Sequence, residues 1–144
     1  MASVRLRRAV LAILAAAAAG PADAQEADAR SLNIELNALQ PSEGGCRLSF
    51  VATNGLGADI SGVSFETVLF DKAGLVERMS VLDFREIPAG KTRVRQFDLV
   101  DVDCTNISRV LINDARSCEG SGLAPGDCSR RLRTTGKADV PFSD

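Results

Sequence analysis

Strict alternation of apolar and polar side chains marks the first segment of this chain that can form a sheet. In residues 31–38, Leu32, Ile34 and Leu36 fall on one side of an extended chain, and polar side chains fall on the other. This period of two is typical of a half-buried β-strand. Further runs follow, separated by turns rich in glycine and proline, and they predict strands over residues 46–54, 60–70, 75–84, 91–100, 107–113 and, at an edge, the polar segment 129–142.

The segment 75–84 is the least regular of these runs, since its apolar positions fit neither a helical nor an extended period. The tight turn at residues 71–74 favours a strand that forms a hairpin with the preceding one. About seven short strands, with no long helix among them, predict an all-β fold. We expect an antiparallel β-sandwich of the immunoglobulin-like or transthyretin-like type, with a β-barrel as the alternative.

Residues 1–24 have the layout of a cleavable signal peptide. Three arginines precede an apolar run over residues 9–19, and a small-x-small cleavage pattern ends at Ala24. The run is shorter than the roughly 20 residues of a membrane-spanning helix, so we expect no span in the mature chain. Its alanine-rich composition indicates a bacterial protein that is periplasmic or secreted. The pair Arg7–Arg8 leaves both the general secretory and the twin-arginine routes open.

Cleavage after Ala24 would leave residues 25–144 as a single domain. The whole chain has 17 basic and 19 acidic residues, and three arginines and one aspartate precede the cleavage point. The mature domain therefore has 14 basic and 18 acidic residues and a net charge of −4. This balance argues against nucleic acid or an anionic membrane as the partner, because both select a basic surface.

Four cysteines lie in the mature part, and in an exported protein an even number predicts disulfides. Cys118 and Cys128 flank a short loop rich in glycine and proline, which favours a local bridge and leaves Cys46 to pair with Cys104. Three connectivities are formally possible. A zinc site is disfavoured, because the chain has no closely spaced cysteine pair and no histidine.

The lack of histidine also removes the usual general base and excludes Ser-His-Asp and Cys-His mechanisms. A pair of carboxylates remains chemically possible, as in glycoside hydrolysis. Glu66, Asp71, Asp83 and Asp98 are candidates, but nothing in their spacing selects two of them. We expect them to be solvated, and we assign no catalytic residue and no cofactor.

Asp98, Asp101 and Asp103 form a local acidic cluster that is a weak candidate for calcium. Calcium prefers oxygen ligands, and three carboxylates within six residues would supply them. The spacing nevertheless lacks the glycine and the distal glutamate of an EF-hand loop. Metal binding is therefore not the expected function.

Arg93, Arg95, Arg109 and Arg116 could form a basic stripe across neighbouring strands. Such a stripe is the best candidate for a surface that binds an anionic ligand or a partner protein. The alternative, which we favour, is that these arginines pair with carboxylates on adjacent strands and protect sheet edges.

Half of the mature domain is similar to the FxLYD-type, immunoglobulin-like domains of exported bacterial proteins. Phe70 takes the place of the tyrosine in that motif. The resemblance implies a fold rather than an activity, because it rests on turn and core residues. The cysteines and the R-V-R-Q-F run at 93–97 look more like those of small secreted alphaproteobacterial proteins. The matching segments are L-S-F-V-A-T-N-G at 48–55, V-S-F-E-T-V-L-F-D-K-A-G at 63–74 and I-P-A-G-K-T at 87–92.

These observations predict a non-enzymatic, exported binding or interaction module whose partner is another periplasmic protein. The alternative is a carboxylate-type hydrolase, or an enzyme inhibitor that acts through the exposed loops 54–59 and 119–127. The sequence does not indicate an oligomeric state.

Overall fold

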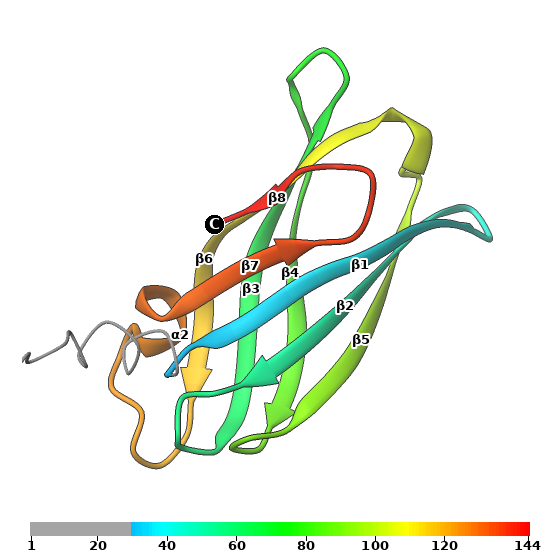
Figure 1. Cartoon of the computed structure of the whole chain (residues 1–144). Helices are drawn as coiled ribbons and strands as arrows, with labels where there is room; N and C mark the ends of the chain where they lie inside the picture. The colour runs from blue at the N-terminus through cyan, green and yellow to red at the C-terminus, as the bar shows by residue number, and fades with distance from the viewer. Residues whose placement is uncertain (1–29) are drawn as a thin grey trace, which may run out of the picture.

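The computed structural model describes residues 30–144, so the predicted signal peptide lies outside the described residues. Two four-stranded sheets pack face to face in this part of the chain (Figure 1). The first, sheet A, contains in spatial order β5 (Thr92–Val100), β2 (Gly45–Asn54), β1 (Leu32–Ser42) and β7 (Leu132–Gly136). The second, sheet B, contains β4 (Val76–Ile87), β3 (Ile60–Asp71), β6 (Ile107–Glu119) and β8 (Phe142–Ser143).

The predicted all-β sandwich is confirmed, and the two separate sheets exclude the closed barrel. The irregular segment after the 71–74 turn is indeed a strand, β4, which pairs with β3 as a hairpin. Two single-turn helices complete the described chain, η1 (Cys104–Asn106) and α2 (Asp127–Arg130). Neither is long enough to cross a membrane.

The C-terminal segment differs from the prediction of one antiparallel edge strand. It begins in α2 and then forms two edge strands, β7 and β8, which run parallel to β1 and β6. The parallel direction arises because α2 lies beside the start of β1, where the Leu32 N–H donates to the Arg131 carbonyl at 2.9 Å. The chain must therefore leave α2 in the same direction as β1.

Phenylalanine side chains fill the centre of the sandwich. Phe84 contacts Phe50 and Phe65 with ring centroids 5.4 and 5.5 Å apart, in edge-to-face geometry. All three rings are fully buried or nearly so. Since Phe50 belongs to sheet A and the other two to sheet B, these contacts join the layers. Aromatic pairs of this kind stabilise a core by more than their buried area alone.

One buried amide ties the two sheets together at the end of β2. The Asn54 Nδ2 donates to the carbonyls of Ala58 and Ile87 at 2.8 and 2.7 Å. Its Oδ1 accepts from the Leu56 N–H at 2.9 Å. Asn54 is fully buried, so its hydrogen bonds replace those that water would otherwise supply. The 54–59 loop is thereby fixed to the end of β4.

Candidate interaction surface

Two disulfides join Cys46 to Cys104 and Cys118 to Cys128, which are the expected pairs. Cys46 lies buried on β2, and Cys104 opens the η1 turn that leads into β6, so the first bridge ties sheet A to the connection between the two sheets. The second bridge holds α2 against the end of β6. Closing loops of these lengths stabilises a fold by about 4 and 3 kcal/mol in the chain-entropy model.

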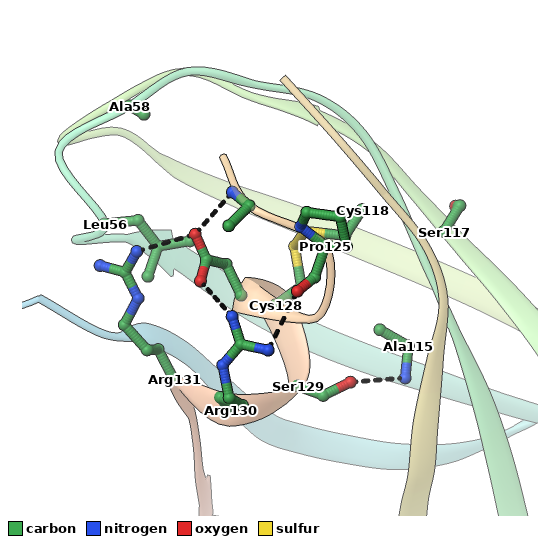
Figure 2. Close-up of a disulfide and its surroundings, with 12 residues drawn as sticks. Leu56, Ala58, Ala115, Ser117, Cys118, Pro125, Cys128, Ser129, Arg130 and Arg131 are labelled. Carbon is green, nitrogen blue, oxygen red and sulfur yellow. Dashed lines mark hydrogen bonds and ion pairs between the residues drawn. A yellow bond between two sulfur atoms is a disulfide. The ribbon is translucent and has the colours of Figure 1, made fainter. Parts of the chain in front are cut away.

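The loop before α2 is fixed by a carboxylate as well as by the disulfide (Figure 2). Asp127 accepts from the Ala124 N–H at 2.9 Å and from Arg130 and Arg131 at 2.9 and 3.0 Å. The backbone N–H and the two guanidinium groups hold the pKa of Asp127 below its usual range, although its burial acts in the opposite direction. The 119–127 loop is therefore tied down by its own contacts.

The three aspartates considered for calcium are not brought together. Asp98 forms a two-point ion pair with Arg47 at 2.8 and 3.0 Å, and these hydrogen bonds lower the pKa of Asp98. Asp103 caps η1 by accepting from the backbone and side chain of Thr105, which lowers the pKa of Asp103. Asp101 lies between them in a left-handed backbone conformation. Within residues 30–144, no group of three or more acidic or cysteine side chains is arranged to hold a metal ion.

The basic stripe considered as a binding surface is not continuous, because its arginines belong to different sheets. Arg93 and Arg95 lie on β5, at the edge of sheet A, whereas Arg109 and Arg116 lie on β6 in sheet B. Arg116 pairs with Glu66 at 3.5 Å across the outer side of sheet B. Arg95 lies 3.7 Å from Glu86 of β4, so in the described part of the chain two of these four arginines show the pairing with a carboxylate that the alternative interpretation favoured.

Arg95 joins the free edges of the two sheets. Its Nε and Nη2 donate to the carbonyls of Phe84 and Glu86 on β4 at 2.7 and 3.0 Å. In the opposite direction, Arg78 on β4 donates to the carbonyl of Val100 on β5 at 3.1 Å. Each edge strand thus satisfies carbonyls of the other, which protects edges that would otherwise be open to pairing with another chain. Arg95 therefore makes the edge-protecting contact that the alternative interpretation favoured.

The four carboxylates considered for catalysis are likewise engaged in local contacts. Within residues 30–144, none of these four carboxylates shares a hydrogen bond with a second carboxylate. Their donors are Arg116 and Asn113 for Glu66, the Leu75 N–H for Asp71, the Arg85 N–H for Asp83 and Arg47 for Asp98.

An apolar area covers the outer side of sheet B, the side turned away from the core. Val76, Met79 and Val81 on β4 are 55, 53 and 56% exposed. Val68 also points outward but is only 5% exposed, because the side chains of the flanking strands cover it. We call this area the apolar face and define it as Val68, Phe70, Val76, Met79, Val81 and Leu111.

The pairing register arranges the outer side of sheet B in rows across β4, β3 and β6. Counted from the β3–β4 turn, which projects beyond the rest of the molecule in Figure 1, the first two rows are apolar except for Arg109. The later rows become polar. The rows are Val76–Phe70–Arg109, Met79–Val68–Leu111, Val81–Glu66–Asp114, Asp83–Ser64–Ser117 and Gly62–Glu119.

Arg109 is the one expected partner residue that lies beside this face. Its guanidinium carbon lies 4.0 Å from the centre of the Phe70 ring, a cation–π contact that holds the side chain against the sheet. No carboxylate within the described part of the chain pairs with it. Arg109 is therefore a fixed cation beside exposed apolar side chains.

Two of the hollows on the surface of the described chain lie near the apolar face and near η1. One, of about 340 Å³, lies at the polar end of the outer side of sheet B and is lined by Asp83, Glu119 and a Ser64–Ser117 pair joined by a 2.7 Å hydrogen bond. The other, of about 480 Å³, lies beside η1 and is lined by β1 and residues 137–140. The second hollow has no converging set of charged groups that would select a ligand.

Comparison with known proteins assigns no family to this chain, because no family model and no curated protein matches it. Among solved structures, the Salmonella enterica trimeric lipoprotein SadB matches with a TM-score of 0.42 and 18% identity. The match covers 49% of this chain and 40% of that one, so the chain spans less than half of the lipoprotein's length. A likeness this distant carries no argument about function.

Proposed function

We propose that the protein is an exported, non-enzymatic interaction module whose contact surface is the apolar face of sheet B. The observation that carries the proposal is the exposure of Val76, Met79 and Val81 on one strand, each more than half exposed. The core is already complete on the other side of the same sheet. Adjacent exposed apolar side chains on a sheet face are typical of a surface that a partner covers.

The available chemistry supports binding rather than catalysis. The chain has no histidine, and the four candidate carboxylates accept hydrogen bonds from groups that fix their positions. The loops 54–59 and 119–127, which an inhibitor would present, are held by Asn54 and by Asp127. A surface that binds a partner protein through its shape and apolar contacts fits this chain better than an active site or an inhibitory loop.

The proposed location is the bacterial periplasm or the exterior. Two disulfides support it, because such bridges persist in oxidising compartments. The signal-peptide pattern in residues 1–24 supports it independently. We also retain kinship with the FxLYD-type domains as a proposal. Its motif, residues 68–71, ends β3 and leads into the projecting turn.

Photo-crosslinking tests the proposed surface. A photoreactive benzoylphenylalanine replaces Met79 on the apolar face or, as the control, Thr135, which is exposed on the edge strand β7 of sheet A. After irradiation of cells that export the protein, we expect a discrete adduct from position 79 that mass spectrometry identifies. The same adduct should disappear when Val81→Glu is added. Equal adducts from both positions, or none from position 79, would count against the proposal.

A further inference from the structure

We infer that the protein that covers the apolar face is basic, and that it places a lysine or arginine side chain in the hollow beside Asp83 and Glu119. The inference rests on the proposed function and adds the chemistry of the partner. Its basis is the excess of negative charge at the polar end of the outer side of sheet B, directly beside the apolar face.

Three carboxylates at this polar end have no cation partner. Asp83 accepts the Arg85 N–H at 2.8 Å, and Asp114 accepts from Ser129 and from a backbone N–H. Glu119 lies in the last row, opposite a glycine. None of the three carboxylates forms an ion pair within the described part of the chain.

The other charges near the polar end do not neutralise these carboxylates. Glu66 and Arg116 pair with each other and add no net charge. Arg85 at the β4 margin is offset by Asp144, which lies near Asp114 at the β6 margin. The three unpaired carboxylates therefore remain as the net charge of this end.

The apolar end of the same side has no such excess. Arg109 and Lys72 there are offset by Asp71 and Glu77 of the β3–β4 turn. A basic group of a partner is therefore attracted to the polar end and not to the apolar end, where Arg109 would repel it. This difference fixes the direction in which a partner can lie on the sheet.

Two of the unpaired carboxylates border one hollow from different strands. Asp83 comes from β4, and Glu119 comes from β6 and reaches over β3, where its Oε2 lies 3.6 Å from the position that a Cβ on Gly62 would take. The hydroxyls of Ser64 and Ser117 complete the polar lining. This hollow of about 340 Å³ thus offers carboxylate and hydroxyl oxygens, which accept hydrogen bonds from an ammonium or guanidinium group.

The hollow adjoins the apolar face along β4. Val81 belongs to both, since it lines the hollow and is 56% exposed on the face. Asp83 lies four residues beyond Met79, which is about 13 Å along an extended strand. A single partner surface can therefore cover Met79 and Val81 with apolar side chains and reach the hollow with a cation. The apolar cover excludes water, and this strengthens the ionic contact.

Other occupants of the hollow are disfavoured. An acidic protein or an anionic membrane would bring like charge to the polar end, which opposes association. A metal ion would find only two carboxylates there, and within residues 30–144 no group of three acidic or cysteine side chains is arranged to hold one.

The yield of the photo-crosslinked adduct from position 79 tests the inference. Asp83→Asn combined with Glu119→Gln removes both charges and retains an acceptor for the Arg85 N–H, and the yield should fall about tenfold. Glu43→Gln combined with Asp139→Asn is the matched control, because it removes two exposed carboxylates from turns outside this surface. The control should leave the yield unchanged, and thermal unfolding of both purified variants verifies that each is folded.

Equal yields from the two variants would overturn the inference, whereas the adduct itself would still support the proposed function. No adduct from position 79 in the otherwise unchanged protein would overturn both. The two failures are therefore distinguishable.

Charge exchange then identifies the cation. Mass spectrometry of the digested adduct gives the partner protein and the crosslinked segment, in which we expect a lysine or arginine. Asp83→Lys should lower the yield at least tenfold, and changing the matching cation of the partner to glutamate should restore most of it. A crosslinked segment without a basic residue, or an adduct with a second copy of this acidic chain, would overturn the inference.

Discussion

Arg95 on β5 donates from its Nε to the carbonyl oxygen of Phe84 on β4 across 2.7 Å, and so joins the free edges of two different sheets. Its side chain is only 19% exposed, which shields this contact from water. A hydrogen bond that involves a charged group contributes more to stability than a neutral one.

Replacing Arg95 should therefore destabilise the sandwich. Arg95→Ala should lower the free energy of unfolding by about 2 kcal/mol, because it removes hydrogen bonds from a charged donor to two carbonyls. Arg93→Ala is the control, since Arg93 donates only to its neighbour Thr92. The measurement is urea unfolding followed by far-UV circular dichroism, because the chain has no tryptophan or tyrosine to report by fluorescence. Equal losses from the two variants would contradict the structural role of Arg95.

Asn54→Ala should cost about 3 kcal/mol, since it removes the partner of one buried carbonyl, one partly buried carbonyl and one buried N–H. Asn37→Ala provides the comparison, because Asn37 is exposed and bonds only to Glu35. Differential scanning calorimetry should show a large drop in Tm for the first variant and little change for the second. A drop of similar size in both would rule out the inter-sheet role of Asn54.

Thr67→Val should stabilise the protein by about 1 kcal/mol. The Thr67 hydroxyl is buried in the interior of sheet B and has no hydrogen-bond partner, so valine removes a desolvated polar group at nearly constant shape. Thr53→Val should instead be neutral or slightly destabilising, because the Thr53 hydroxyl bonds to Thr92 at 2.8 Å. Urea midpoints of the two variants give the comparison. A destabilised Thr67→Val protein would show that the hydroxyl has a partner in solution.

Acid should loosen the α2 segment through Asp127. The pKa of Asp127 is lowered in the folded state, so the stability it contributes is fully present above the unfolded pKa of about 3.9. That contribution is lost as the pH falls through the lowered folded value. At pH values below about 4, the Tm of the wild type should thus decrease. The difference in Tm between the wild type and Asp127→Asn should become smaller over the same range. Asp139→Asn, in the exposed β7–β8 connection, controls for the loss of one charge. A difference that stayed constant with pH would exclude this role.

Local patterns were sufficient to predict most of the fold. The alternation of Leu32, Ile34 and Leu36 identified β1, and all three are fully buried. The loop composition between Cys118 and Cys128 identified the local disulfide. The direction of β7 was not predictable, because it depends on where α2 meets the start of β1, a contact between residues about a hundred positions apart.

The candidate surface was only partly visible in the sequence. Arg109 was identified as a partner residue, but its relation to Phe70 depends on the register between β3 and β6. The signals for the apolar face were present in Val68 and Phe70, which lie opposite the core residues of the same strand, and in the poor periodicity of 75–84. That periodicity fails because β4 has apolar side chains on both faces, with Met79 and Val81 exposed and Leu82 and Phe84 buried.

The parallel pairing of β1 with β7 also sets an order of events while the chain emerges, N-terminus first, into the compartment where it folds. Leu32 pairs with Leu132, so the first strand to emerge waits for nearly the whole chain before its outer edge is covered. Cys46 can meet Cys104 earlier, once 58 further residues have emerged. The bridge between Cys46 and Cys104 can therefore form in a chain whose sheet A is still incomplete. In such an intermediate, oxidation would hold β1 and β2 in place until the C-terminal strand arrives.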